Sequence, residues 1–239
     1  FNPGSTPRNI PMKTALILKL YQAMGPLIFF PLSVWLWLNR YDDHQWLSLF
    51  GLFVPIVFAT VVPFVGIRVL GLWEIKTKLS SQGFRPHHGL FFGTATSLLA
   101  LLCLPAEPMV SVADMFRAGF VLAMTVGFIN WFYDVFAIKA GMLAVYNKPF
   151  SEGASEEAIA MQYAPALFGG FGFIYGLSLR WAESIALSEP SPTMIGAVFG
   201  LASFASITVP LIFSELYHYL TVKESGFISY KPRHEVTGK

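Results

Sequence analysis

Six long apolar segments alternate with short polar connections along the chain. They cover residues 14–38, 46–73, 89–105, 116–138, 163–182 and 194–222, and the third is the shortest. A helix needs about 20 mainly apolar residues to cross the bilayer core. Backbone groups in lipid must bond to one another, and these segments lack the short alternating strands of a membrane barrel. The pattern predicts an all-α, polytopic integral membrane protein with six transmembrane helices, forming one domain over residues 1–239.

The composition agrees with this class. Apolar residues make up 54% of the chain and charged residues only 13%, whereas a soluble domain carries about 25% charged residues. The net charge of +2 is small and the basic residues are dispersed, so we expect no nucleic-acid partner. The single cysteine, Cys103, excludes an intrachain disulfide and a cysteine metal cluster.

The basic residues fall mainly on one side of the predicted topology. Thirteen of the 16 lysines and arginines lie on the side of the N-terminus: Arg8, Lys13, Lys19, Arg68, Lys76, Lys78, Arg85, Lys139, Lys148, Lys223, Lys231, Arg233 and Lys239. The other side has Arg40, Arg117 and Arg180. Cytoplasmic loops carry the excess of lysine and arginine, so both termini are expected on the cytoplasmic side or in the equivalent compartment.

The first apolar segment is longer than the core of a secretory signal and ends in the aromatic pair Trp35 and Trp37. It is therefore expected to be a retained helix. The chain begins with Phe1, which leaves open an upstream segment such as an organellar presequence. We expect an integral protein of a bacterial or organellar inner membrane.

Prolines and glycines predict irregularities and close packing within the helices. Prolines that should kink or unwind their helices stand at positions 26, 31, 55, 63 and 210. Glycine pairs that should permit close helix approach are Gly89 with Gly93, Gly172 with Gly176, and Gly196 with Gly200. Ser155 precedes two glutamates and is expected to cap a helix.

Ionisable residues inside apolar segments gather on the basic side of the membrane. Asp134 stands in an aromatic run with Asn130 one turn away on the same face. Glu215 and His218 are three residues apart and share a face of the sixth helix. Because the fourth and sixth helices descend to the same side, we expect Asn130, Asp134, Glu215 and His218 to line one pocket as catalytic groups.

Charged groups at membrane depth are costly and normally find a partner. The counter-charge of Asp134 is expected to be Arg68, His88 or His218. The alternative interpretation is structural, with Asp134 in a buried ion pair that fastens the second, fourth and sixth helices together.

A basic region precedes the third helix on the same side. We predict that it binds a substrate head group through Arg68, Lys76, Lys78, Arg85, His87 and His88. The alternative is that these residues only follow the positive-inside rule and touch anionic lipid.

Cofactors and metals remain open. A single metal held by Asp134, Glu215, His218 and His87 or His88 is one alternative, because carboxylate and imidazole groups are common ligands. The pair Glu215 and His218 has the spacing found in di-iron bundles, but the chain has one copy of that pair. The catalytic and phosphate-binding motifs of soluble enzymes are absent from the sequence.

Three functions fit this pattern. The preferred one is a membrane-embedded enzyme that acts on a lipid, isoprenoid or other amphipathic substrate in a polar pocket of the inner leaflet. The alternatives are a small transporter or channel, and a structural subunit of a larger, organellar membrane complex. Membrane lipids are the expected partners, with other membrane subunits or further copies of the chain as additional candidates.

Overall fold

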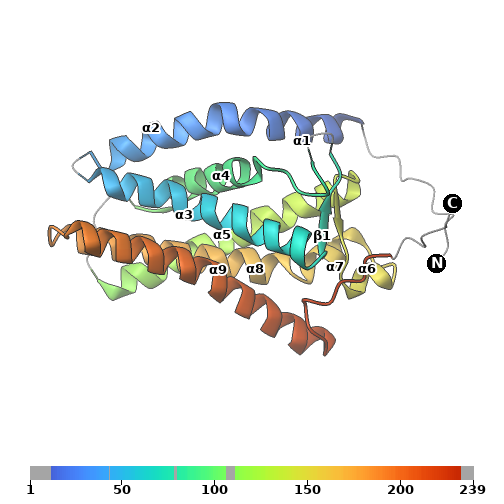
Figure 1. Ribbon diagram of the computed structural model, residues 1–239. Helices are drawn as coiled ribbons and strands as arrows, with labels where there is room; N and C mark the ends of the chain where they lie inside the picture. Colours follow the sequence, from blue (N-terminus) through green and yellow to red (C-terminus); the bar gives the residue numbers. More distant parts are fainter. Residues whose placement is uncertain (1–11, 43, 78–79, 106–110, 233–239) are drawn as a thin grey trace.

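The computed structural model describes residues 12–42, 44–77, 80–105 and 111–232. Long helices lie side by side and run roughly along one direction, with a small sheet and two short helices at one end (Figure 1). The long helices, in chain order, are α1 (Met12–Met24), α2 (Phe30–Arg40), α3 (Gln45–Phe64), α4 (His88–Cys103), α5 (Val112–Lys139), α8 (Ala164–Ala186) and α9 (Pro192–Val222). The predicted all-helical fold is thus confirmed.

Two helices widen locally where prolines were expected to disturb them. α1 and α2 are joined by the π-helical segment η1 (Gly25–Phe29), which contains Pro26. α3 continues into a second π-helical segment, η2 (Val65–Val69), directly after Pro63. Proline removes a backbone donor and pushes against the preceding turn, so a wider turn follows at these two positions. Pro31, Pro55 and Pro210 lie within stretches of α-helix, so the predicted unwinding is not seen there.

Four helices in the described part of the chain are long and apolar enough to cross a membrane. They are Leu16–Arg40, Gln45–Val69, Val112–Lys139 and Pro192–Val222, and His88–Cys103 is a shorter apolar helix. α8 has the length of a span, but it carries Arg180 and Glu183, which are buried against other helices. A helix enclosed by protein can be less apolar than one that faces lipid. Six crossings therefore remain a prediction.

Glycines bring α8 close to α5, and α4 close to α3. α5 and α8 form the most extensive helix pair, and a Cβ atom added at Gly172 would lie 2.5 Å from the carbonyl oxygen of Leu122 on α5. A Cβ atom at Gly93 would likewise lie 2.5 Å from the Cα atom of Ile56 on α3. Open space surrounds Gly196 and Gly200 on α9, so the predicted close approach is wrong for that pair.

A short antiparallel sheet, not anticipated from the sequence, covers one end of the bundle. Strand β1 (Trp73–Ile75) pairs with β2 (Leu143–Val145), with Glu74 opposite Ala144. The segment after α9 returns to this sheet, where the backbone amide of Tyr230 donates to the carbonyl oxygen of Tyr146 at 2.8 Å. The strands therefore tie together the chain after α3, the chain after α5 and the end of the described chain.

Two short helices, α6 (Lys148–Ser151) and α7 (Glu156–Met161), lie at the same end as the sheet (Figure 1). The hydroxyl of Ser155 accepts from the backbone amide of Ala158 at 3.3 Å. The predicted helix cap at Ser155 is confirmed, and it fixes the start of α7 after the turn from α6.

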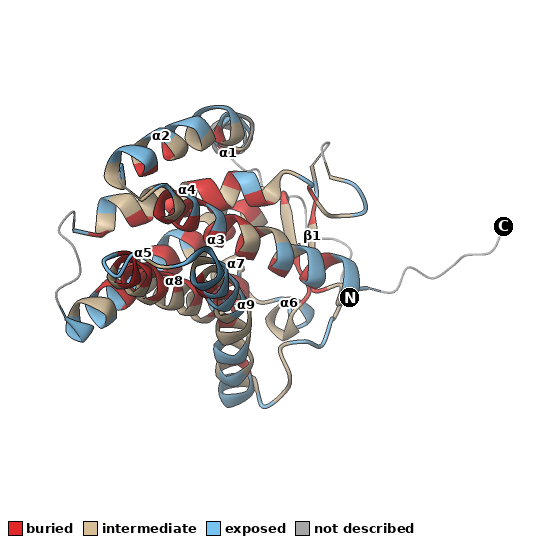
Figure 2. Cartoon of the chain, turned by 60° about the vertical axis from the view of Figure 1, so that its left-hand side comes forward, coloured by how far each residue is buried: buried red, intermediate tan, exposed pale blue. Residues whose placement is uncertain are grey.

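Burial is highest where α3, α5 and α8 meet. Phe171 and Tyr175 of α8 pack against α3, and the rings of Phe171 and Phe58 stack at 3.9 Å. The outer faces of α2 and α9 are largely exposed (Figure 2), and they carry apolar side chains such as Trp35, Phe204 and Ile212. Exposed apolar faces of this extent are typical of surfaces that contact lipid or another protein.

Candidate functional site

A cavity of about 90 Å³ lies inside the bundle, near the end that carries the sheet. Its walls come from α3, α4, α5 and α8, and β1 and β2 cover it with Trp73, Ile75 and Leu143. Most of its lining is apolar or aromatic, including Phe58, Phe92, Phe168 and Phe171. Polar groups that line this central cavity are therefore surrounded mainly by apolar side chains, which cannot form hydrogen bonds with them.

Asp134 is the carboxylic acid of the central cavity. Only 6% of its surface is exposed, and its Oδ2 atom accepts a hydrogen bond from the hydroxyl of Tyr163 at 2.5 Å. The side chain of Asn130, one turn earlier on α5, also lines the cavity and donates to the carbonyl oxygen of Val126 at 2.8 Å. The partner expected for Asp134 was a cation, but a tyrosine at the start of α8 takes that place.

Further polar residues of the lining come from α1, α4 and α5. Gln22 donates from Nε2 to the hydroxyl oxygen of Tyr133 at 2.8 Å. His88 lines the cavity at the first turn of α4, and its Nδ1 atom is buried without a hydrogen-bond partner in the described structure. An imidazole in this position can accept or donate a proton when a ligand enters.

Arg85 is the cation of the cavity. It is 3% exposed, and its Nε and Nη1 atoms have no hydrogen-bond partner among the described residues. Burial lowers the pKa of Arg85, although arginine stays protonated at any ordinary pH. The cavity thus combines a fixed positive charge with a carboxyl group and an imidazole.

Glu215 and His218 do not reach this cavity, so the expectation of one pocket for all four catalytic candidates is wrong. They line a separate cleft of about 420 Å³ between α3 and α9. Glu215 accepts from the backbone amide of Gly226 at 2.8 Å, and His218 Nδ1 lies 3.1 Å from the carbonyl oxygen of Glu224. Both side chains hold the segment that follows α9.

The α3–α9 cleft shares part of its wall with the central cavity. Val62, Trp73, Tyr163 and Leu167 line both spaces. The rings of Trp73 and Tyr163 lie 5.9 Å apart. These two aromatic side chains form part of the boundary between the polar cavity and the apolar cleft.

The other predicted head-group residues are dispersed. Arg68 and Lys76 are exposed, and the Nη1 atom of Arg68 lies 3.4 Å from the carbonyl oxygen of Ser81. Lys78 lies outside the described residues. His87 is half-buried, and burial together with the nearby charge of Arg85 lowers its pKa. Arg85 and His88 are therefore the members of the predicted set that line the central cavity.

The single-metal alternative is not supported by the geometry. Within the described ranges, no three histidine, cysteine, aspartate or glutamate side chains are close enough together to hold a metal ion. Asp134 and His88 lie in one cavity, whereas Glu215 and His218 lie in the other. The residues predicted to bind one metal ion are therefore divided between two separate spaces.

A second buried charge cluster lies at the opposite end of the helices. Glu183 accepts from Arg180 and from the hydroxyl of Tyr41, and its Oε1 atom lies 3.4 Å from Nη2 of Arg40. Arg40 also donates to the carbonyl oxygen of Pro105 at 2.6 Å. The cluster joins α2 to α8 and to the chain after α4, which indicates a structural role.

No family model, curated protein or solved structure matches this chain. The site is therefore interpreted from its own residues. Sequence reasoning missed Tyr163 and Gln22, because neutral polar side chains near helix ends carry no motif. It had placed Arg85 with the head-group residues, but gave no sign that its side chain is buried and lines the same cavity as Asp134.

Proposed function

We propose that the protein is a membrane-embedded enzyme that acts on an amphipathic small molecule in the central cavity. The observation that carries this proposal is that Asp134, His88 and Arg85 line one cavity with apolar and aromatic walls. Ionisable groups at membrane depth are functional sites by default because of their cost. Clusters of acids and bases in clefts are typical of active sites.

Asp134 is the proposed general acid or base. The Tyr163 hydroxyl holds one of its carboxylate oxygens, which fixes the orientation of the carboxyl group toward the cavity. A positioned carboxyl group that transfers a proton contributes about 100-fold to 10,000-fold to a rate. His88 is the second proton-transfer candidate, because its Nδ1 atom is buried and free of a partner in the described structure.

The membrane arrangement belongs to the same proposal. We place all six long helical segments across the bilayer, with α4 and α8 as crossings besides the four longest apolar helices. The α2–α3 and α8–α9 connections lie at one end of the bundle, and the sheet, α6 and α7 lie at the other (Figure 1). Lys76, Arg85, Lys139 and Lys148 belong to the sheet end, which favours that end as the cytoplasmic or equivalent side.

A lipid-turnover experiment tests the enzymatic role. Wild-type protein and the Asp134→Asn variant are reconstituted into nanodiscs. The nanodiscs contain a total lipid extract from the membranes of the cells in which the protein is expressed. Lipid composition is then followed over time by mass spectrometry. We expect at least one amphiphile to be converted by the wild type, and its conversion to fall at least about 100-fold in the variant, as for the loss of an acid–base group.

Asp114→Asn is the matched control, because it makes the same change at the other end of α5. It should convert the same amphiphile at nearly the wild-type rate. Equal conversion by Asp134→Asn and wild type would show that Asp134 is not the acid or base. If Asp134→Asn fails to fold while Asp114→Asn folds, Asp134 is a structural fastener. No conversion by the wild type would favour the transporter or subunit alternatives.

A further inference from the structure

Arg85 is a buried cation without a counter-ion among the residues that the structure describes. None of the ion pairs formed by the described residues includes Arg85 or Asp134. Asp134 is bonded to Tyr163, and two of the Arg85 nitrogen atoms have no acceptor. Burying an unpaired charge costs several kcal/mol, on the order of the whole stability of a small domain. Such an arrangement is typical of a site that is completed by a bound anion.

The start of α4 adds to the positive potential at this position. α4 begins at His88, three residues after Arg85, and it runs for 16 residues. The first amides of a helix point outward and carry a partial positive charge that favours anions. The unpartnered Nδ1 of His88 stands at the same helix end. The guanidinium of Arg85 and the imidazole of His88 therefore line the central cavity together, next to the positive end of the α4 dipole.

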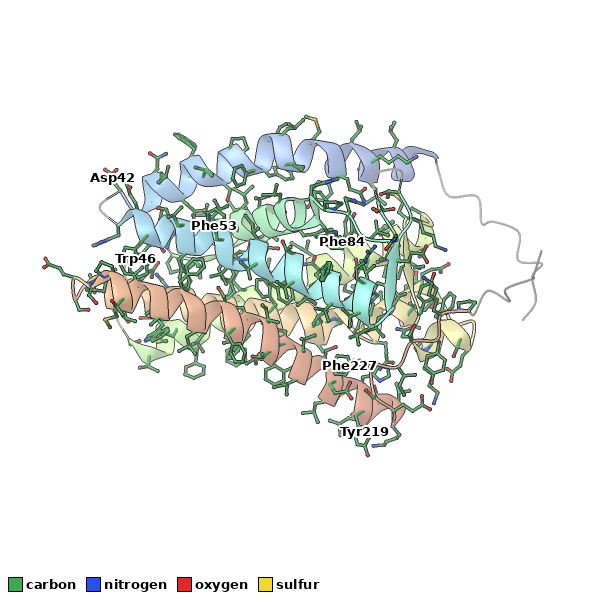
Figure 3. The ribbon with its side chains drawn as sticks, in the orientation of Figure 1. Asp42, Trp46, Phe53, Phe84, Tyr219 and Phe227 are labelled. Atoms are coloured by element: carbon green, nitrogen blue, oxygen red, sulfur yellow. The ribbon has the colours of Figure 1, made fainter. Side chains whose placement is uncertain are left out.

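The α3–α9 cleft supplies an apolar space next to this polar one. Leu211 and Ile207 of α9 face Val61, Val65 and Leu70 across it. α9 diverges from the bundle toward its C-terminal end, where Figure 3 shows Tyr219 and Phe227. The polar side chains of the cleft, Glu215 and His218, are engaged by the segment after α9, so the remaining lining offers mainly apolar contacts.

We propose that the substrate is an amphiphile with an anionic head group, either a carboxylate or a phosphate, and a single long apolar chain. The head group binds Arg85 in the central cavity, and the chain passes the Trp73 and Tyr163 boundary into the α3–α9 cleft. This inference rests on the proposed function for its site, and it names the substrate class. The polar cavity, of about 90 Å³, is the smaller space and would hold the compact head group. The apolar cleft, of about 420 Å³, is the larger space and would hold the long chain.

Binding of three probes tests the head-group assignment. Dodecyl phosphate, dodecanoate and dodecanol share one chain and differ in the head group. Affinity is measured by the thermal stabilisation of the purified protein in nanodiscs of zwitterionic lipid, since a ligand that binds the folded state raises the melting temperature. We expect the wild type to bind at least one anionic probe about 10-fold to 100-fold more tightly than dodecanol, as for one charge-assisted hydrogen-bonded contact.

Arg85→Gln should remove this preference, so that anionic and neutral probes bind alike. Arg68→Gln is the matched control, because Arg68 is an exposed arginine at the same end of the bundle. It should keep the full preference. A preference for phosphate over carboxylate, or the reverse, identifies the head group. Equal binding of dodecanol and both anionic probes by the wild type would overturn the inference, as would equal effects of the two arginine substitutions.

A substitution in the cleft tests the position of the chain, and it keeps the inference falsifiable if Arg85→Gln does not fold. Leu211→Trp fills the cleft and should weaken dodecyl phosphate at least about 10-fold, while butyl phosphate binds as before. Leu201→Trp, at an exposed position of α9, should change neither affinity. Unchanged dodecyl phosphate binding in Leu211→Trp would place the chain elsewhere.

The two proposals fail in different ways. Selective anion binding by Asp134→Asn, without conversion of any lipid by the wild type, would leave the anion site standing and remove the enzymatic role. If the wild type converts a neutral amphiphile and shows no preference for anionic probes, the enzymatic role stands and the anionic head group is excluded.

Discussion

Glu183 is a buried carboxylate shared by two arginines. Its side chain is 7% exposed and that of Arg180 is 2% exposed, so the pair is shielded from solvent. Removing one member of a buried ion pair leaves the other charges without compensation and costs about 3–5 kcal/mol. The residue therefore stabilises the end of the bundle opposite the central cavity, independently of any ligand.

We predict that Glu183→Gln lowers the free energy of unfolding by about 3–5 kcal/mol and lowers the melting temperature of the purified protein. The matched control is Glu157→Gln. Glu157 pairs with Lys139 at the surface, with about half of each side chain exposed (46% and 38%). Surface pairs contribute about 0–1 kcal/mol, so the control should melt close to the wild type. Equal melting of the two variants would contradict a structural role for Glu183.

The candidate site shows what residue-level reasoning can and cannot predict. The sequence prediction from membrane depth included Asp134, Asn130 and His88, and these three residues line one cavity. Depth gives no information on the direction in which a side chain points around the bundle, and Glu215 and His218 point into a different space. Tyr163 was missed because its hydroxyl matters only through its contact with Asp134, which joins residues far apart in the chain.

At the scale of elements, the helices were predictable and the strands were not. Hydrophobic length located each long helix to within a few residues, and Pro26 and Pro63 marked the two π-helical segments. Strands of three residues are too short to show a period of two. β1 follows η2 and β2 follows α5, so the two strands pair only when segments far apart in the chain are brought together by the fold.

The α5–α8 interface gives a prediction at this scale. A side chain at Gly172 would meet the backbone of α5, so Gly172→Ala should push the helices apart and destabilise the protein by about 1–3 kcal/mol. The same change at Gly200 has open space around it. Alanine is favoured over glycine in a helix by up to about 1 kcal/mol, so Gly200→Ala should melt at or above the wild-type temperature.

Both variants are measured by thermal unfolding in the same detergent. If Gly172→Ala and Gly200→Ala melt at the same temperature, close backbone contact does not hold α5 against α8. That result would also remove the support for α8 as the enclosed central helix.

At the scale of the whole molecule, the central cavity depends on α4 and α8. These are the two long helices that fall short of the length or hydropathy expected of an independent span, and both help to line the cavity. Shortness in α4 and polar groups in α8 are tolerated because neighbouring helices bury them. The two helices with the weakest evidence for a crossing are therefore the ones whose crossing the proposed enzyme site depends on.

Cysteine labelling tests this topology. In a Cys103→Ser background, which removes the only native cysteine, single cysteines replace the exposed residues Ser81, Ser151 or Ser188. A membrane-impermeant maleimide is added to intact cells and then to permeabilised cells. If all six helices cross, cysteines at positions 81 and 151 lie on the cytoplasmic side and react only after permeabilisation, whereas position 188 reacts in intact cells.

Each helix has its own diagnostic outcome. Because α4 and α5 separate positions 81 and 151, labelling of these two positions on opposite sides would show that one of the two helices does not cross. α5 is long and apolar enough to span the membrane, so that result would exclude α4 as a crossing. Because α8 separates positions 151 and 188, labelling of both on the same side would show that α8 does not cross. Either outcome would leave the polar groups of the cavity without a membrane around them, and the cost that makes them functional candidates would disappear.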